Sequence, residues 1–176
     1  MGTILCYGDS NTWGVDSRSF IGGRMPDDVL WTNLLEKMTG WHVENHGQNG
    51  RQIPSSDHEL IWVRKLLDDA PVKEAPVWLW IMLGTNDLLV HEDFTAEDVA
   101  ARMRTFLETI REHPNVRSGC VKLRLISPPP MFSDIISGFT AVSRALDCVK
   151  LHFCLCFCTQ PLLKLWFCAI FKTVRL

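Results

Sequence analysis

The stretch Val77-Trp78-Leu79-Trp80-Ile81-Met82-Leu83, followed directly by Gly84-Thr85-Asn86-Asp87, decides the fold. An unbroken apolar run of this length is typical of a strand that is buried on both faces at the centre of a parallel sheet. The glycine and the polar residues after it end the strand and form a loop. The stretch therefore predicts an α/β fold with a polar loop at the carboxyl end of a central strand.

Other apolar runs alternate with helical patterns on both sides of this strand. Strands are predicted over 3–7, 41–44, 77–83 and 122–126, and helices within 26–38, 57–69, 95–113 and 134–147. We expect Thr95 to cap its helix, with Asp98 three residues further on, and Pro114 to close it. Because strands and helices alternate, the crossovers are right-handed, and the sequence predicts a parallel sheet with helices on both faces.

Two of the predicted helices carry apolar residues at the spacing of one buried face. These are Trp31, Leu34, Leu35 and Met38 in the first helix, and Leu60, Ile61, Val63, Leu66 and Leu67 in the second. Cys6 and Cys120 are assigned to strands, where free thiols behave as small hydrophobes.

Length and composition narrow the class of protein. A chain of 176 residues is long enough for one domain with a sizeable core. The net charge of −2 provides no basic field, so we expect no nucleic-acid partner. The first residues contain no basic segment of the kind that begins a secretory signal, so we expect a cytoplasmic protein.

Three of the predicted loops have unusual compositions, and all follow strands. They are Tyr7-Gly8-Asp9-Ser10-Asn11-Thr12-Trp13-Gly14, Asn45-His46-Gly47-Gln48-Asn49-Gly50-Arg51 and Leu83-Gly84-Thr85-Asn86-Asp87. Each has a plain structural explanation: a helix-capping serine, a glycine turn, and a turn held by an Asn or Asp side chain. Ligands bind beyond the carboxyl ends of the strands in such sheets, so the coincidence of all three loops there favours a site.

The motifs Gly8-Asp9-Ser10, Gly50 and Gly84-Thr85-Asn86-Asp87 together resemble the first three blocks of the SGNH (GDSL) hydrolase superfamily. The wider stretches 8–14, 29–32, 81–87 and 126–130 are similar to its arylesterase and acyltransferase branch, and the resemblance covers about residues 2–147. It implies a three-layer, flavodoxin-like fold.

The same resemblance implies a role for each site residue. Ser10 would be the nucleophile, and the Ser10 N–H, the Gly50 N–H and the Asn86 side chain would form the oxyanion hole. Asp9 and Asp87 would support the site, with Asp87 bracing its loop. The reaction would be acyl transfer from a small-molecule ester to water or another alcohol. Neither a metal nor an organic cofactor is needed, and homo-oligomers are expected to be possible.

The catalytic base is unknown. The superfamily takes it from an Asp-x-x-His block, but the residues three positions before the six histidines of this chain are Thr39, Val43, Ser55, Leu88, Ile110 and Val149. His46 and His91 lie close to the predicted site loops, where we expect surface or supporting roles for both. We therefore predict that the activity of this chain is severely impaired, because a serine hydroxyl is a poor nucleophile without a base.

Residues 148–176 differ from the rest of the chain. They contain five of the seven cysteines and no Asp, Glu or Gly. Our hypothesis divides the chain into a hydrolase-like domain at 1–147, incomplete at its carboxyl end, and an atypical tail from a shifted reading frame, a splice variant or a gene-model error. A membrane anchor is disfavoured because His152, Gln160-Pro161 and Lys164 interrupt the apolar run. Zinc binding by Cys154, Cys156 and Cys158 is also disfavoured, because their spacing is not that of structural zinc sites.

Three classes of function remain open. The first is an ester hydrolase in which Ser10 is the nucleophile. The second is a non-catalytic remnant of the same fold that binds a small ligand or a partner. The third is a membrane-anchored protein that uses the tail.

Overall fold

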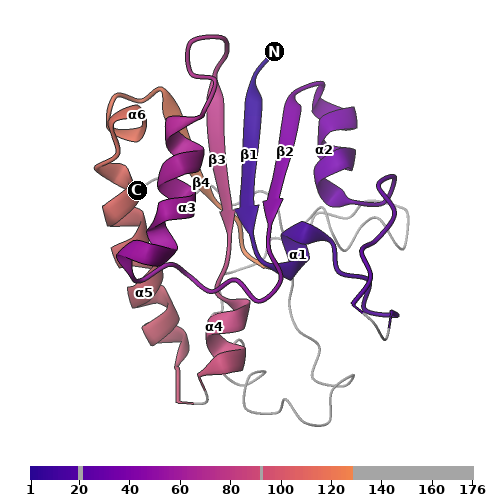
Figure 1. The fold of residues 1–176 in the computed structure, drawn as a ribbon, viewed down its shortest axis with the longest axis vertical. Coiled ribbons are helices and arrows are strands. Elements are labelled where there is room, and N and C mark those ends of the chain that lie inside the picture. Colours follow the sequence, from indigo (N-terminus) through magenta and orange to yellow (C-terminus); the bar gives the residue numbers. More distant parts are fainter. Residues whose placement is uncertain (20–21, 92, 129–176) are drawn as a thin grey trace, which may run out of the picture.

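The computed structural model describes residues 1–19, 22–91 and 93–128 (Figure 1). In these residues the strands are β1 (Thr3–Gly8), β2 (His42–Gly47), β3 (Val77–Met82) and β4 (Val121–Leu125). The helices are α1 (Ser10–Trp13), α2 (Trp31–Thr39), α3 (Asp57–Asp68), α4 (Thr85–Val90), α5 (Ala96–Arg111) and α6 (Pro114–Arg117). The predicted alternation of strands and helices is confirmed over this part of the chain.

The four strands form one parallel sheet in the order β2-β1-β3-β4. This is the beginning of the flavodoxin-like strand order, and it agrees with the predicted fold class. Gly8 at the end of β1 pairs with Gly47 of β2 and with Met82 of β3. The carboxyl ends of the three strands are therefore level, and α1 and α4 both lie at this edge of the sheet (Figure 1).

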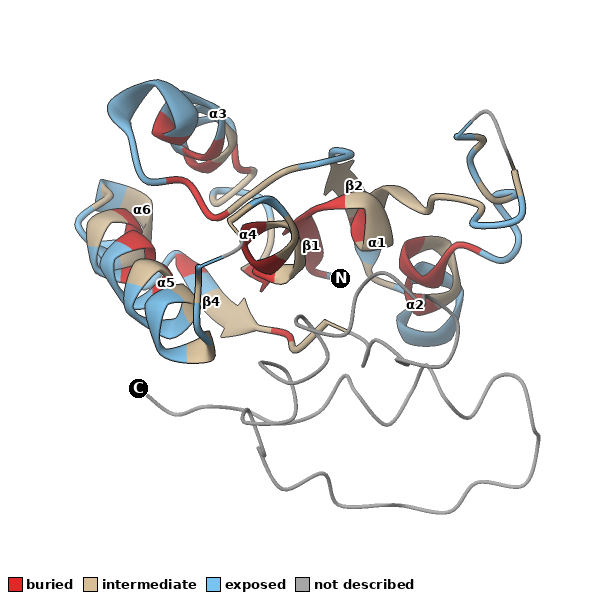
Figure 2. Ribbon diagram, turned by 90° about the horizontal axis from the view of Figure 1, so that it is seen from below, coloured by how far each residue is buried: buried red, intermediate tan, exposed pale blue. Residues whose placement is uncertain are grey.

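Two hydrophobic cores cover the two faces of the sheet, because successive side chains of a strand point to opposite faces. On one face, the odd-numbered residues of β1 and β3 pack against helices α3 and α5. On the other face, Ile4 and Cys6 pack with Trp31 and Leu35 of α2. The buried residues line the inner faces of the helices (Figure 2). Burial on both faces explains why β1 and β3 are almost wholly apolar in sequence.

Several predicted boundaries change in the structure. Helix α2 begins only at Trp31, because residues 26–29 form a turn in which the Val29 N–H donates to the Pro26 carbonyl. Thr95 and Asp98 form the predicted capping box, but α5 ends at Arg111. Pro114 becomes the first residue of the short helix α6, a position that suits its fixed φ angle. Strand β2 runs on to Gly47, beyond its predicted end.

Three predicted burials are wrong. Met38, in the last turn of α2, is 66% exposed, and the contact of α2 with the sheet is made by Trp31 and Leu35. Ile61 is 52% exposed, because it lies beside the stripe of α3 that faces the core. Cys120 is exposed and directly precedes β4.

Some predictions lie outside the described residues: the helix over 134–147 and every hypothesis about residues 148–176. None of the helices within the described ranges is both long and apolar enough to cross a membrane.

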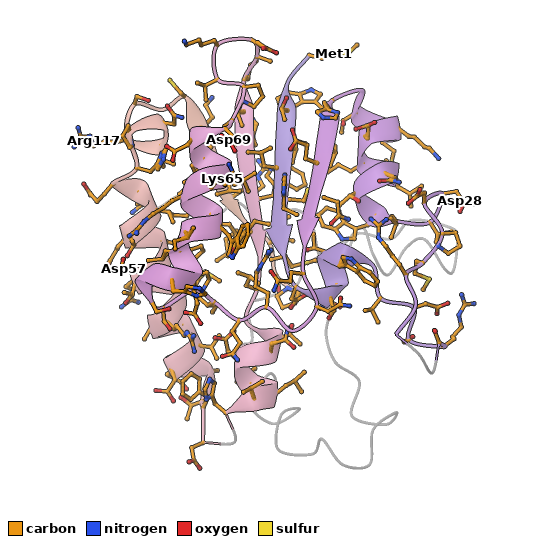
Figure 3. All side chains as sticks on the ribbon, viewed as in Figure 1. Met1, Asp28, Asp57, Lys65, Asp69 and Arg117 are labelled. Atoms are coloured by element: carbon orange, nitrogen blue, oxygen red, sulfur yellow. The ribbon has the colours of Figure 1, made fainter. Side chains whose placement is uncertain are left out.

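Helix α3 provides a test of the core assignment, because one of its faces is buried and the other is exposed to solvent. Leu67 is fully buried in the core, whereas Lys65 and Asp69 form an ion pair of 3.2 Å at the surface (Figure 3). We expect Leu67→Ala to lower the free energy of unfolding by about 2–5 kcal/mol, because it leaves a cavity. Ile61→Ala on the same helix should change it by no more than about 0.5 kcal/mol. Urea denaturation of both variants measures the difference, and equal losses would contradict the assignment.

Candidate active site

Ser10 lies where the chain turns from β1 into α1. It is the first residue of α1, and Asp9 is the helix cap. A β-carbon on Gly8 would lie 2.0 Å from Thr12 Oγ1 and 2.9 Å from the Met82 carbonyl oxygen. Only glycine fits, because α1 folds back tightly over the end of the strand. The sharp turn places Ser10 at the carboxyl edge of the sheet.

Asp9 holds this turn from inside the protein. Its side chain is fully buried, and Oδ1 accepts hydrogen bonds from the Asn11 backbone N–H at 2.8 Å and from Asn11 Nδ2 at 3.0 Å. Burial raises the pKa of Asp9, while the two Asn11 hydrogen bonds and the charge of Arg51 act in the opposite direction. Asp9 therefore serves to order the Ser10 turn.

Strand β2 and helix α2 hold α1 from the outside. A β-carbon on Gly47 would lie 2.1 Å from the Trp13 backbone nitrogen, so the two backbones are in direct contact. Asn45 Nδ2 donates to the Thr12 carbonyl at 2.7 Å, and the Trp31 indole N–H donates to the Asn11 carbonyl at 3.1 Å. The carbonyls at the end of α1 thus bond to side chains from two other elements.

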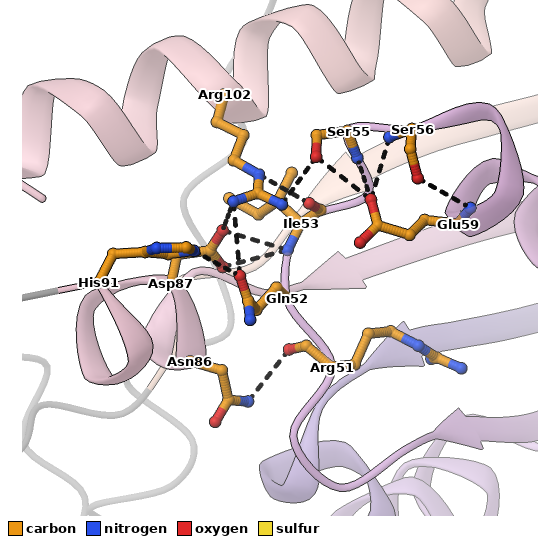
Figure 4. A network of polar contacts seen from close by, with 10 residues as sticks. All are labelled: Arg51, Gln52, Ile53, Ser55, Ser56, Glu59, Asn86, Asp87, His91 and Arg102. Atoms are coloured by element: carbon orange, nitrogen blue, oxygen red, sulfur yellow. Dashed lines mark hydrogen bonds and ion pairs between the residues drawn. The ribbon is translucent and has the colours of Figure 1, made fainter.

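The third loop is mostly helical, contrary to the prediction. Gly84 has a φ of +117°, in the region that favours glycine, and it begins α4. Asn86 therefore lies in the first turn of a helix, and its Nδ2 donates to the Arg51 carbonyl at 3.0 Å (Figure 4). This bond joins the loop after β3 to the loop after β2, one residue from Gly50.

Asp87 is the buried anchor of α4. It is fully buried, its carboxylate accepts the Ile53 N–H at 3.1 Å, and it lies 3.4 Å from Arg102 Nη1 (Figure 4). Burial raises the pKa of Asp87, which the Ile53 N–H and the Arg102 charge oppose. Arg102 also donates to the Ile53 carbonyl at 2.9 Å, so α5 binds the same segment. These contacts hold α4, α5 and residues 51–53 together.

The three residues predicted to form the oxyanion hole follow the adjacent strands β1, β2 and β3. Gly50 has a φ of +74° and is exposed, so its conformation favours glycine although a side chain would have space. Within the described part of the chain, neither the Ser10 N–H nor the Gly50 N–H has a hydrogen-bond acceptor. Both donors are therefore available for a ligand at this edge.

Comparison with known proteins identifies the family. Residues 6–145 match the GDSL-like Lipase/Acylhydrolase family. The chain belongs to this family. No curated protein sequence matches it.

Solved structures agree with this assignment. A carbohydrate acetylesterase family member from Sinorhizobium meliloti is 28% identical, with a TM-score of 0.64, over 86% of this chain and 75% of that protein. The native aryl esterase of M. smegmatis has the same fold at 22% identity, with a TM-score of 0.63, over 84% of this chain and 75% of that protein.

A GDSL-like hydrolase needs a base beside its serine, and the nearby histidines have other partners here. His46 Nε2 lies 2.9 Å from Glu44 Oε2. His91 Nε2 lies 2.9 Å from Gln52 Oε1, and the His91 ring stacks on Phe94 with centroids 4.3 Å apart. Among the residues that the structure describes, no side chain accepts a hydrogen bond from the Ser10 hydroxyl.

Sequence reasoning overlooked the two arginines that join the loops of this GDSL-like site. Arg51 appeared only as the last residue of a glycine-containing loop, and Arg102 lies within the helix predicted over 95–113 without having been singled out. The position of Arg51 directly after Gly50 was the one available signal. Nothing local marks Arg102, because its partners are about 15 and 49 positions away in sequence.

The buried carboxylate of Asp9 predicts an unusual pH dependence. Because its pKa is raised in the folded state, its favourable contribution to stability is complete below the ordinary value of 3.8 and is lost as the pH rises through the folded-state pKa. Asp9→Asn removes the charge and keeps an acceptor oxygen. We expect the free energy of unfolding of Asp9→Asn, relative to the parent chain, to increase from pH 3.5 to 6.5 in urea denaturation.

Asp98 provides a matched control of opposite sign. Its pKa is lowered by hydrogen bonds from the Thr95 backbone and side chain, so Asp98→Asn should lose stability relative to the parent as the pH rises toward the ordinary value. A pH-independent difference for Asp9→Asn would show that Asp9 titrates normally.

Proposed function

We propose that this chain is a serine ester hydrolase of the GDSL type, in which Ser10 is the nucleophile. In this proposal the Ser10 N–H, the Gly50 N–H and the Asn86 carboxamide form the oxyanion hole, and Asp9 and Asp87 support it. No metal or organic cofactor takes part in the proposed reaction.

The bond from Asn86 Nδ2 to the Arg51 carbonyl supports this proposal most directly. One N–H of the carboxamide is used in that bond, which fixes the plane of the amide. In this proposal the second N–H is left for a substrate oxygen, together with the N–H groups of Gly50 and Ser10, which have no acceptor among the described residues. Donors held in place before the reaction stabilise the negative charge that develops in the transition state.

The chemistry follows from these groups. Ser10 Oγ forms a bond to the acyl carbon, its proton passes to a base, and the carbonyl electron pair moves onto the oxygen bound by the three donors. When the C=O bond re-forms, the bond to the alcohol breaks and the alcohol leaves with a proton. Water, or a second alcohol, then attacks the acyl-serine in the same way and releases the acyl group.

We propose small acyl esters as substrates. The resemblance of this sequence to the arylesterase and acyltransferase branch supports this class. The carbohydrate acetylesterase family member at 28% identity supports a short acyl group such as acetyl. Hydrolysis and acyl transfer share the first half of the reaction.

We propose further that turnover is slow. The sequence contains no Asp-x-x-His block, and no described side chain accepts the Ser10 proton. In a serine hydrolase, removal of the histidine lowers kcat by about 10⁶-fold, and the remaining rate comes from binding and the oxyanion hole. The same observation favours a second candidate function, a ligand-binding remnant that holds an ester without cleaving it.

Rescue by imidazole separates these functions. Without a base, the parent chain and Ser10→Ala should hydrolyse p-nitrophenyl acetate at similar slow rates, because the serine contributes little until it is deprotonated. Added imidazole should then accelerate the parent more than Ser10→Ala, and intact mass should show an acetyl group on the parent only. Equal acceleration would exclude Ser10 as the nucleophile. A fast parent rate that Ser10→Ala abolishes would instead show that a base is present.

Asn86 provides the test of the oxyanion hole. We expect Asn86→Ala to lower the slow turnover of p-nitrophenyl acetate by roughly 10²-fold or more, which is the effect of losing one such donor. Asn115→Ala is the matched control, because Asn115 Nδ2 also donates to a backbone carbonyl, that of Leu67 at 2.8 Å, on the α6 side of the fold. Equal rates for Asn86→Ala and the parent would contradict the proposed hole.

A further inference from the structure

Arg51 contacts all three loops of the site. Its Nη1 donates to the Gly8 carbonyl at 2.9 Å and to the His46 carbonyl, near the ends of β1 and β2. Its Nη2 donates to Gln48 Oε1 at 3.0 Å. The side chain therefore binds the Ser10 turn and the loop that contains Gly50.

The backbone of Arg51 reaches the third loop. Its carbonyl accepts the hydrogen bond from Asn86 Nδ2, and its nitrogen follows Gly50 directly. The side chain and the carbonyl of one residue thus link the segments that carry the nucleophile and all the proposed oxyanion donors.

We infer that Arg51 is a positioning residue that sets the orientation of the Asn86 carboxamide and of the Gly50 N–H relative to Ser10. This inference rests on the proposed function of the site. Among the described residues Arg51 has no hydrogen bond to Ser10; its guanidinium carbon lies 4.1 Å from the centre of the Tyr7 ring, and Nη1 donates to the Gly8 carbonyl.

The chemistry of arginine suits this role. The planar guanidinium carries five N–H donors in a fixed fork, so it can bind Gly8, His46 and Gln48 at once and stack on Tyr7. Burial lowers the pKa of the Arg51 guanidinium, while the Tyr7 hydroxyl and the Asp9 carboxylate act in the opposite direction. A lysine has one compact ammonium group and cannot reach the same set with the same geometry.

Nuclear magnetic resonance of the Asn86 side chain tests the inference without depending on catalysis. In ¹⁵N-labelled protein, the two Asn86 Nδ2 proton signals should be well separated, and exchange with water should be slow. In Arg51→Met we expect these signals to converge and exchange at least about tenfold faster, because the carbonyl of residue 51 is no longer held in place. Arg51→Lys keeps the charge without the fork and should give an intermediate result. If Arg51→Met does not fold, the Asn86 signals of Arg51→Lys test the inference.

Arg24→Met is the matched control. Arg24 also donates to a backbone carbonyl, that of Trp13 at 2.8 Å, and lies 5.8 Å from the centre of the Trp13 ring. It has no bond to the loop that contains Gly50 or to Asn86, so the Asn86 signals should keep their positions.

The turnover of p-nitrophenyl acetate supplies the second measurement. If Arg51 acts by orienting the donors of the proposed oxyanion hole, Arg51→Met should lower kcat about as much as Asn86→Ala does. The KM should change less than about threefold. The double variant should be no slower than Asn86→Ala alone, because residues that act as a unit are not additive. Losses that multiply in the double variant would overturn the inference.

The two measurements distinguish failure of the inference from failure of the proposed function. Unchanged Asn86 signals in a folded Arg51→Met or Arg51→Lys overturn the positioning role, whatever the activity. Shifted signals in a chain whose turnover does not respond to Asn86→Ala support the positioning role and overturn the proposed oxyanion hole.

Discussion

Direct contact between the backbone of α1 and the end of β2, at Gly47, is the constraint on which the site depends. With a β-carbon 2.1 Å from the Trp13 nitrogen, no other residue fits at position 47 unless the backbone moves. Gly8 imposes the same condition from β1, where Thr12 and the Met82 carbonyl leave no space. The two glycines let a single helical turn lie flat on the sheet edge, and Ser10 begins that turn. A looser contact would free the serine to move relative to its neighbouring loops, and catalysis depends on positions held to a fraction of an ångström.

Buried charged side chains fix the positions of the loops around α1 and α4. Asp9 and Asp87 are both fully buried, and Arg51 and Arg102 bind the loops around them. The ion pair between Asp87 and Arg102 contributes little to net stability, because the loss of hydration offsets most of the attraction. Their directional hydrogen bonds do define geometry: Asp87 holds the Ile53 N–H, and Arg102 holds the Ile53 carbonyl. The polar network therefore serves the arrangement of the loops, while the two apolar cores supply the stability.

The proposed site combines a set of hydrogen-bond donors with a serine whose hydroxyl has no hydrogen-bond partner among the described residues. In the proposed function, the Ser10 and Gly50 N–H groups and the Asn86 amide stabilise the oxyanion, and this stabilisation acts even when proton transfer is slow. His46 and His91 each use Nε2 in a contact with Glu44 or Gln52, and among the described residues neither ring has a hydrogen bond to Ser10. Under this proposal, oxyanion binding and proton transfer can be measured separately.

The sequence by itself determined the sheet, its parallel direction and the loops that carry the site. These follow from local patterns: the apolar run at Val77–Met82, the capping box at Thr95 and Asp98, and the motif Gly8-Asp9-Ser10. It could not determine the helices α1 and α4, which are too short for a periodic pattern, or the exposure of Ile61, whose apolar character equals that of its buried neighbours. Only the tertiary structure decided the roles of Arg51 and Arg102, because their hydrogen bonds join segments that are distant along the chain and meet only where parallel strands end together.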